Sequence, residues 1–469
     1  MRSTSRLVPL PALLFALALL VSPATPVRSL HAQARHRNVL ILVGDDHGRD
    51  LGCYGAPVRT PHLDSLAREG TRFDYAFCTV SSCSPSRSVI MSGLHTHANG
   101  MYGLQHAVHK QSSLDSVRGL PNLLRTAGYR SLCVGKYHVA PEASYRFDEY
   151  SNEGGGRNGA RMAQAAAAWL GKDPERPFLL YMGFTDPHRG ARGFANEGDY
   201  PGMTRDRYDP ARVTPPPFLP DHPDTRGDLA DYYESVGRLD QGVGHVLRVL
   251  RDSGHLDDTL ILYLSDNGIP FPGAKTTFYE PGMRLPLIVR APAQQRRGVV
   301  SRAMVSWTDV LPTVLAYTGT AGPAYPLPGR SFLGVLDQDN PAGWDVVYGS
   351  HQFHEITMYY PMRVIRTRRH KYILNLAHGL PAPFASDLYN SATWQGVLRR
   401  KDTRVGQRTL DAFLHRPRHE LYDLKQDPGE TRNLASDPLL KPVLTDLQTR
   451  LRTWQDQTKD PWLVKYTHE

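Results

Sequence analysis

The sequence of 469 residues predicts an α/β fold, with a large, mostly parallel sheet covered by helices on both faces and a smaller C-terminal part that contains an antiparallel sheet. Three observations lead to this prediction. Apolar runs of strand length alternate with stretches of helical period, which is the pattern of parallel strands buried on both faces. Polar clusters follow directly on several apolar runs. After a break at Asn340 to Gly343, shorter strands separated by turns replace this alternation.

The N-terminus has the pattern of an export signal at residues 1–34. Arg2 and Arg6 precede an apolar run from Leu10 to Val21, and Ala32-Gln33-Ala34 offers a small-residue cleavage site. The run is too short to span a membrane comfortably, and no later run is longer. We therefore expect cleavage near Ala34, no membrane span and a periplasmic or secreted protein. The absence of any N-x-[ST] sequon favours a bacterial setting.

The predicted elements of the larger part each have a local reason. Asn38 to Val43 is an apolar strand, and the helix that follows has Thr60 as its cap, Pro61 at its first position and Gly70 at its end. The further predicted strands are Ser131 to Gly135, Phe178 to Phe184, Thr259 to Leu264 and Pro286 to Val289. The further predicted helices are Leu120 to Ala127, Ala160 to Leu170, Asp228 to Ser253 and Thr308 to Thr318.

The C-terminal part has a different pattern. Arg363 to Leu376 and Glu420 to Leu424 predict strands, and Pro438 to Gln455 predicts a final helix. Turn residues such as Asp427-Pro428-Gly429 lie between these elements, as in a small antiparallel sheet. We therefore predict two domains, a larger one at residues 35–360 and a C-terminal α+β subdomain at residues 361–469.

Charge and cysteine content narrow the function classes. The formal net charge of +9 favours anionic partners, although a solubilising surface charge explains it equally well. The densest basic run, Arg363 to Lys371, alternates with apolar residues and predicts a strand with one solvated face. No zinc-finger, helix-turn-helix or RNA-binding signature accompanies it, so we expect no nucleic-acid partner. The four cysteines contain no C-x-x-C pair and predict no disulfide framework: Cys53, Cys78, Cys83 and Cys133.

Four polar clusters each follow directly on one of the predicted strands. One such cluster alone is most often a turn or a helix cap. In open parallel sheets, however, the carboxyl ends of the strands converge on one ligand crevice, so four clusters in the same position predict a shared pocket. The clusters are Asp45-Asp46, Lys136 with His138, Asp186 with His188, and Asp266-Asn267.

The acidic clusters predict a metal site. Asp45, Asp46, Asp266 and Asn267 offer only oxygen ligands, which calcium and magnesium prefer, and calcium accepts a crowded, irregular shell. The pairs His95/His97 and His106/His109 have spacings found in zinc sites. No cysteine or carboxylate is spaced to complete a tetrahedron with them, so we interpret them as loop or buried structural histidines.

The segment Cys83-Ser84-Pro85-Ser86-Arg87 is the most specific feature of the sequence. Ser84 can cap a short helix, Pro85 suits its first position and Gly93 ends it. Cys83 would then lie at a helix N-terminus, where free amides and the helix dipole attract an anion. A structural thiol beside a Ser-Pro turn is the alternative that any single cysteine allows.

The C-x-P-S-R pattern at Cys83 to Arg87 resembles the motif in which sulfatases convert cysteine into formylglycine. The resemblance covers nearly the whole mature chain and is closest to the N-sulfoglucosamine sulfohydrolases. One departure is Lys275, where arginine is usual in that subgroup. The stretches that match are Ser81 to Arg87, Asn99 to Gly103, Gly135-Lys136 with His138-Val139, Asp186 to Arg189, Asp240 to Gly244, Ser265 to Pro272, His354-Glu355 with Pro361 to Arg363, and Leu421 to Asp423 with Asp427-Pro428 and Glu430.

The resemblance implies a role for each site residue. Calcium would be held by Asp45, Asp46, Asp266, Asn267 and an oxygen of the modified Cys83. Arg87 would orient the aldehyde hydrate, and Lys136, His188 and Lys275 would surround the sulfo group. His138 would be the base that collapses the sulfated intermediate. Asp186, Arg189 and Glu355 would contact the sugar. The implied partners are a sulfated saccharide and a formylglycine-generating maturation enzyme, and a homodimer is one candidate assembly.

The implied activity is hydrolysis of the N-sulfo group of terminal N-sulfoglucosamine in heparan- or heparin-type saccharides. A hydroxyl of the hydrated aldehyde would attack sulfur, with His188 protonating the amine that leaves. Two alternatives remain open: an O-sulfatase acting on glycosaminoglycan or aryl sulfates, and a noncatalytic binder of sulfated polysaccharide. A phosphonate or phosphate monoesterase on the same fold is disfavoured, because its two-zinc relatives tend to have Asp-His where this chain has Asp266-Asn267.

Overall fold

A nine-stranded mixed sheet forms the centre of the unit His36–Glu469, in the order β4-β3-β5-β1-β6-β8-β2-β7 with β9 beside β2. The structure is a computed structural model that describes Met1 and residues 38–190 and 193–466. Apart from Met1, the predicted signal at residues 1–34 lies outside the described residues. Within the described residues no helix is both long and apolar enough to cross a membrane.

The parallel half of the sheet matches the sequence prediction closely. It consists of β4 (Glu149–Ser151), β3 (Arg130–Gly135), β5 (Phe178–Gly183), β1 (Asn38–Gly44) and β6 (Thr259–Ser265). The mixed half consists of β8 (Leu287–Arg290), β2 (Thr71–Phe77), β7 (Arg284–Leu285) and β9 (Val299–Ser306), where β8 runs antiparallel to both β6 and β2. The α/β prediction is confirmed, although β2, β4, β7 and β9 were not predicted.

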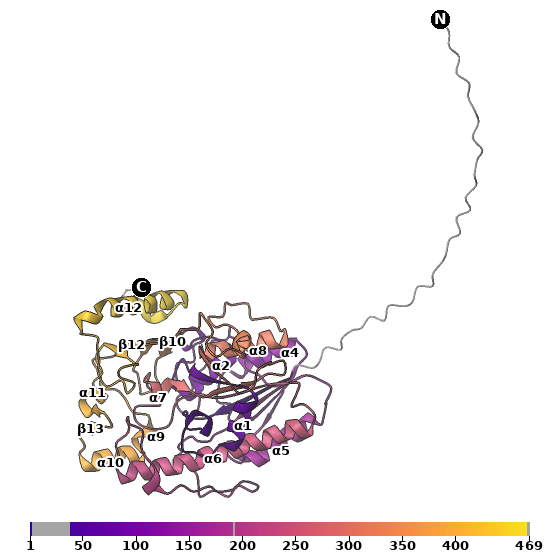
Figure 1. Cartoon of the computed structure of the whole chain (residues 1–469), viewed down its shortest axis with the longest axis horizontal. Coiled ribbons are helices and arrows are strands. Elements are labelled where there is room, and N and C mark those ends of the chain that lie inside the picture. The colour runs from indigo at the N-terminus through magenta and orange to yellow at the C-terminus, as the bar shows by residue number, and fades with distance from the viewer. Residues whose placement is uncertain (2–37, 191–192, 467–469) are drawn as a thin grey trace. The chain divides into compact units, whose positions relative to one another are not determined.

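Alternate residues of β1 enter two separate cores, one on each face of the sheet. Ile41 belongs to the core shared with α2, α4 and α8, whereas Leu40 and Leu42 belong to the core shared with α1, α5 and α6. Figure 1 shows these two groups of helices on opposite sides of the sheet. Since every residue of β1 is buried, its continuous apolar sequence follows from burial on both faces.

The predicted helices all form, with shifted ends. The first residues of α6 differ most, because His222 caps that helix by accepting from the amide of Thr225 at 3.2 Å, and Pro223 occupies the first position. Helix α6 therefore begins before the predicted Asp228. The helices of the large sheet are α1 (Pro61–Glu69), α2 (Cys83–Ser92), α3 (Thr96–Asn99), α4 (Leu120–Thr126), α5 (Gly159–Leu170), α6 (Pro223–Asp252), α7 (Glu280–Met283) and α8 (Val310–Thr318).

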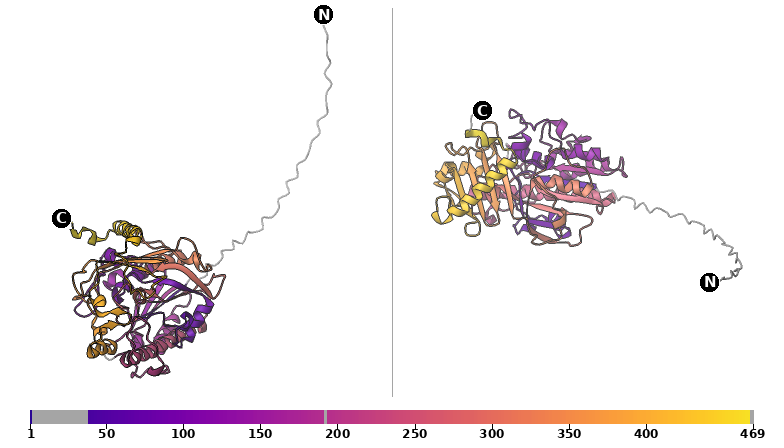
Figure 2. Two further views of the ribbon diagram at one scale, coloured as in Figure 1. Left: turned by 60° about the vertical axis from the view of Figure 1, so that its left-hand side comes forward. Right: turned by 90° about the horizontal axis from the view of Figure 1, so that it is seen from above.

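A separate four-stranded antiparallel sheet lies in the C-terminal part, as predicted. Its order is β10 (Val346–His351), β11 (Met362–Thr367), β12 (His370–Asn375) and β15 (His419–Asp423). Helix α12 (Lys441–Gln457) packs across it through Leu447, Leu451 and Trp454 (Figure 2, right). The remaining elements are α9 (Ser386–Tyr389), α10 (Ala392–Arg400), α11 (Leu410–Leu414) and the hairpin of β13 (Arg404–Val405) and β14 (Arg408–Thr409).

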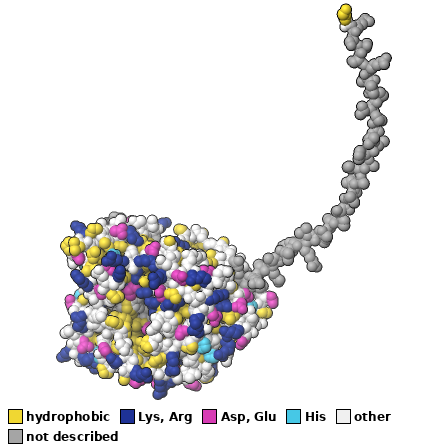
Figure 3. Space-filling view, in the orientation of Figure 1, with side chains coloured by type: hydrophobic (Ala, Val, Ile, Leu, Met, Phe, Trp, Pro, Cys, Tyr) yellow, Lys and Arg dark blue, Asp and Glu magenta, His cyan; other side chains and the backbone are white. Residues whose placement is uncertain are grey.

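The basic run in the small sheet does not form a strand with a solvated face. Arg363 is fully buried in an ion pair with Asp460, and Lys371 is fully buried between Glu280 and Glu430. The prediction was wrong because local alternation cannot show that acidic residues from distant segments neutralise these cations. On the face seen in Figure 3, the remaining Lys and Arg side chains are interspersed with Asp and Glu.

Candidate active site

The carboxyl ends of four neighbouring strands, β3, β5, β1 and β6, bring the four polar clusters together. The amide of Asp46 donates to Oδ1 of Asp266 at 3.0 Å. Lys136 forms an ion pair with Asp45, and Nε2 of His188 lies 3.8 Å from Oδ2 of Asp46. Asp46 has a φ of +59°, a left-handed conformation that non-glycine residues rarely adopt and that is concentrated at functional sites.

Cys83 is the first residue of α2 and is almost completely buried. Its Sγ lies 3.6 Å from Oδ1 of Asp46. Helix α2 therefore places the thiol beside the acidic cluster, by which we mean Asp45, Asp46, Asp266 and Asn267. The prediction that Ser84 caps this helix was wrong, because Ser84 lies inside the helix and its Oγ accepts from the amide of Gln105 at 3.1 Å. Gly93 ends the helix in the left-handed conformation, as predicted.

Arg87 follows Cys83 by about one helical turn and is fully buried. Its Nε donates to Oδ2 of Asp266 at 2.8 Å, and its Nη1 donates to the carbonyl of Lys136 at 2.9 Å. The guanidinium therefore ties α2 to the ends of β6 and β3.

The acidic cluster has the donors that a hard cation requires. Burial raises the pKa of Asp46 to about 6 and that of Asp266 to about 7, because no charge in the protein compensates them fully. Among the described residues, Oδ1 of Asp45 and Oδ1 of Asn267 are buried and have no hydrogen-bond partner. A buried oxygen that accepts no hydrogen bond destabilises the folded protein unless it has another partner, such as a metal ion. This group of oxygens therefore fits an oxygen-coordinated cation.

The two histidine pairs considered as zinc ligands lie in different surroundings. His95 and His97 are buried and pack edge-on against Trp454, with ring centroids 4.9 and 5.2 Å away. Their interpretation as structural histidines is confirmed. The second pair differs, because Nδ1 of His106 lies 2.6 Å from Nε2 of His138.

His138 lies at the edge of the acidic cluster, in a left-handed conformation with φ of +61°. Its Nδ1 is buried and has no hydrogen-bond partner among the described residues. Burial lowers the pKa values of His138 and His188, so both imidazoles are neutral in the protein alone. A neutral imidazole can accept a proton. The contact between His106 and His138 escaped the sequence reasoning because His106 follows no strand.

Lys275 connects the acidic cluster to a residue that the sequence did not single out. Its Nζ lies 2.8 Å from Oδ2 of Asp46 and 2.7 Å from Oδ2 of Asp387. Asp387 is in α9, a short helix of the C-terminal part. No strand leads into α9, so the strand-end rule that found the other residues does not apply to it.

Asp186 and Arg189 lie inside ion-pair networks. Both carboxylate oxygens of Asp186 accept from Arg238, at 2.7 and 2.8 Å. Arg189 is buried, donates to both oxygens of Asp228 and donates to the carbonyl of Pro270 at 3.1 Å. These contacts hold the loop that contains His188, and they occupy the groups that were expected to contact a sugar.

Glu355 contacts α9. Its Oε1 accepts from the amide and from the hydroxyl of Ser386, both at 2.7 Å. Its neighbour His354 is buried and bonds to Oγ of Ser82, the residue before Cys83, at 2.7 Å. The segment His354-Glu355 therefore links the start of α2 to the start of α9.

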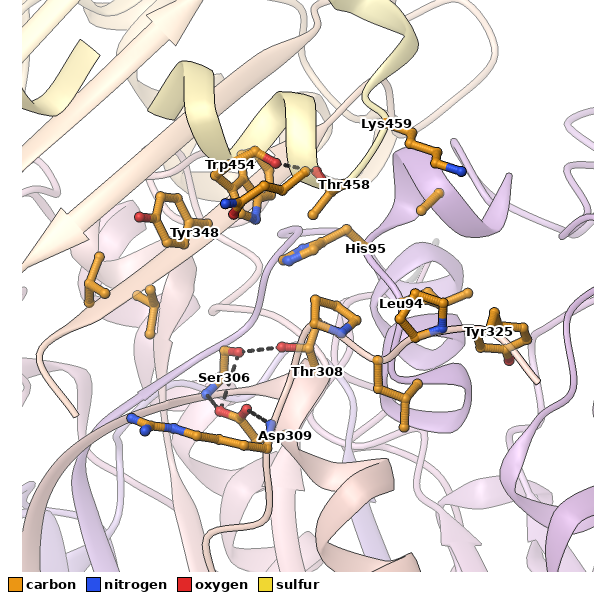
Figure 4. Close-up of a pocket in the computed structure, with 18 of the residues that line it drawn as sticks. Leu94, His95, Ser306, Thr308, Asp309, Tyr325, Tyr348, Trp454, Thr458 and Lys459 are labelled. Carbon is orange, nitrogen blue, oxygen red and sulfur yellow. Dashed lines mark hydrogen bonds between the residues drawn. The ribbon is translucent and has the colours of Figure 1, made fainter. Parts of the chain in front are cut away.

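A cavity of about 670 Å³ lies elsewhere, between the start of α3, the loop around Tyr325 and the end of α12 (Figure 4). Its lining includes His95, Tyr348 and Trp454. None of the residues of the acidic cluster lines it, so the predicted chemistry does not belong to this cavity.

Comparisons with known proteins identify the family to which the sequence is similar. A family profile described as Sulfatase matches residues 37–320, and one described as N-sulphoglucosamine sulphohydrolase, C-terminal, matches residues 274–378. The chain is 44% identical over 466 residues to human N-sulphoglucosamine sulphohydrolase, covering 92% of each protein.

Solved structures show the same fold at low sequence identity. One, described as a complex with its substrate D-glucosamine-2-N,6-O-disulfate, has a TM-score of 0.67 and 21% identity, covering 91% of this chain and 98% of that chain. The phosphonate monoester hydrolase of Agrobacterium radiobacter has a TM-score of 0.68 and 19% identity, covering 90% and 96%. Because both align equally well, the fold alone does not distinguish their chemistries.

Proposed function

We propose that this chain, which belongs to the sulfatase family and is a hydrolase, removes the N-sulfo group from terminal N-sulfoglucosamine in heparan- or heparin-type saccharides. The observation that supports this substrate best is the identity to the human N-sulphoglucosamine sulphohydrolase over nearly the full length of both proteins. The acidic oxygens and the lysines around Cys83 are groups that such a reaction would use.

Calcium is the metal that we assign to the acidic cluster. Asp45, Asp46, Asp266 and Asn267 would hold it, with an oxygen at position 83. When bound, the ion would polarise that oxygen and offset charge on the sulfo group. The unpartnered oxygens of Asp45 and Asn267 support this assignment.

We assign formylglycine to position 83. Burial raises the pKa of the Cys83 thiol well above its ordinary value, which disfavours the thiolate form of the unmodified residue. An aldehyde hydrate would supply one hydroxyl that attacks sulfur and a second whose deprotonation releases sulfate. The position of Cys83 beside Asp46 supports this role.

The surrounding residues would then act on the sulfo group and the leaving amine. Lys136 and Lys275 offer cations to the sulfo oxygens, and Arg87 holds the start of α2 in place. His138 is the proposed base, in agreement with its neutral state and free Nδ1. His188 is the proposed acid, since the negative charge of a bound sulfo group would favour its protonated form.

The test of this function is a substrate panel on protein produced with a formylglycine-generating enzyme. We expect hydrolysis of N-sulfoglucosamine with higher kcat/KM than of glucosamine 6-O-sulfate or an aryl sulfate. Preference for an O-sulfate would support the O-sulfatase alternative. Tight binding of heparin oligosaccharides without turnover by protein shown to contain formylglycine would support the noncatalytic alternative.

The cellular assignments are also proposals. We infer that residues 1–34 direct export to the periplasm or the medium, and that a maturation enzyme modifies Cys83. Residues 35–360 and 361–469 remain our proposed domains, although β10 of the small sheet precedes that boundary. A homodimer remains the assembly to test by light scattering.

A further inference from the structure

The side chain of Asp387 is partly exposed to solvent, unlike those of its neighbours Asp46 and Lys275. Its side chain is 14% exposed, whereas Asp46 and Lys275 are 0% and 1% exposed. His188, with 25% exposure, opens on the same region. Oxygen and nitrogen atoms of Asp46, His188 and Asp387 lie within 4.8 Å of one another. Asp387 and His188 therefore form an open edge of the site beyond Lys275.

This edge is distinct from the side that contains the nucleophile. A second group with ligand atoms within 4.8 Å of one another consists of Asp45, Cys83 and Asp266. Asp46 lies between the two groups, because its Oδ1 faces the thiol of Cys83 and its Oδ2 faces Lys275. A sulfo group attacked from position 83 would therefore have its leaving atom on the side of His188 and Asp387.

We propose that Asp387 selects substrates whose leaving atom is nitrogen. The N–H of a sulfamate can donate a hydrogen bond to the Asp387 carboxylate. The bridging oxygen of a sulfate ester has only lone pairs, which the carboxylate repels. Lys275 lies between Asp387 and the rest of the site, so it offsets repulsion between this carboxylate and the sulfo anion. This inference rests on the proposed function and identifies the residue that distinguishes N-sulfo from O-sulfo substrates.

The chemistry of the transfer strengthens this preference. As the S–N bond breaks, its electron pair stays on nitrogen, and nitrogen takes a proton from His188. The sulfo group passes to a hydroxyl oxygen at position 83, and the proton of that hydroxyl goes to a neighbouring carboxylate such as Asp266. The amine product gains N–H bonds and, once protonated, a positive charge. A carboxylate beside nitrogen stabilises both changes, and charge-assisted hydrogen bonds are the stronger kind.

Glu355 has a supporting part in this arrangement. By accepting from both polar groups of Ser386, it fixes the first residue of α9, and Asp387 is the next residue. We therefore treat Glu355 as a positioning residue that acts through α9.

The test is Asp387→Asn, which keeps the shape of the side chain and removes its charge. We expect kcat/KM for N-sulfoglucosamine to fall roughly 10- to 100-fold, while kcat/KM for an aryl sulfate falls less than about threefold or rises. Asp411→Asn, at an exposed aspartate in α11, is the matched control. It should leave kcat/KM unchanged for both substrates. Glu355→Gln should also lower kcat/KM for N-sulfoglucosamine relative to kcat/KM for the aryl sulfate, but by a smaller factor.

A structural role predicts a different result. If Asp387 only holds Lys275, which would bind the sulfo group common to both substrates, both values of kcat/KM fall equally and the proposal is overturned. A second measurement does not need turnover: glucosamine, as its ammonium form, should bind wild type more tightly than Asp387→Asn in calorimetry, whereas 2-deoxyglucose, which has no donor group at carbon 2, should bind both equally. Equal glucosamine binding would overturn the inference. Lack of N-sulfoglucosamine hydrolysis by matured wild type would instead overturn the proposed function.

Discussion

Nε of Arg87 lies 2.8 Å from Oδ2 of Asp266, and both side chains are completely buried. Removal of one member of such a pair leaves a buried charge without a partner. Arg87→Met should therefore lower the free energy of unfolding by about 3–5 kcal/mol, measured by urea denaturation of calcium-free, unmodified protein. The double variant Arg87→Met/Asp266→Leu should recover part of the loss. A loss below about 1 kcal/mol for the single variant would show that the pair is not isolated from solvent.

Cys83 should be found as formylglycine in active protein. Because a thiol has no second hydroxyl whose deprotonation releases sulfate, unmodified protein should be inactive towards every sulfate tested. Mass spectrometry of the peptide that contains residue 83 distinguishes the two forms. Cys83→Ala should abolish turnover and keep the thermal unfolding midpoint, since all four cysteines are free and no disulfide depends on this one. An active preparation that contains only the thiol would exclude this mechanism.

Calcium should stabilise the folded protein and be needed for activity. A ligand that binds only the folded state raises its stability in proportion to the logarithm of its concentration. A calcium-selective chelator should lower both the thermal midpoint and kcat. Asp266→Ala, which removes a proposed ligand, should lose the response to added calcium. Stoichiometric zinc in active protein, found by elemental analysis, would contradict the assignment.

Asp240 should make stability depend on pH. Burial raises its pKa from 3.8 to about 7, although the amides of His62 and Leu63 donate to its carboxylate. Since the folded state binds this proton more tightly than the unfolded state, the stabilisation is complete below about pH 4 and disappears as pH rises through about 7.

Asp240→Asn removes this proton equilibrium without a large change in shape. The stability of wild type minus that of the variant should therefore decrease between pH 4 and pH 8, by at most about 4 kcal/mol. Urea denaturation at several pH values measures the difference. A difference that is constant with pH would mean that Asp240 has an ordinary pKa in the folded protein.

His106 should support the proposed base. With its Nδ1 2.6 Å from Nε2 of His138, it fixes the orientation of that ring. Loss of one such hydrogen bond costs about 1 kcal/mol, so His106→Ala should lower kcat roughly fivefold and leave KM nearly unchanged. His106→Gln keeps a hydrogen-bonding group and should recover part of the rate. His109→Ala, at the neighbouring ring, is the matched control.

The central strands and most residues of the candidate site could be predicted from the sequence alone. The strands β1, β3, β5 and β6 were predictable because strands buried on both faces must be continuously apolar, and this is a local property. Their polar ends were predictable as one pocket because parallel strands end at the same edge of a sheet. The position of Cys83 at the start of a helix also followed from local signals, of which Gly93 was correct and Ser84 was not.

Other residues reach the site from segments that neither the apolar strand pattern nor the position of strand ends identifies. Only the tertiary structure shows that these residues contact the site. Asp387 and His106 reach the site from a short helix and a loop, and no period or strand end marks them. The burial of Arg363 and Lys371 depends on acidic partners far away in sequence. The enclosure of Asp186 and Arg189 depends in the same way on helix α6. Local patterns report how a segment is built, whereas the partners of a buried charge are set by the packing of whole elements.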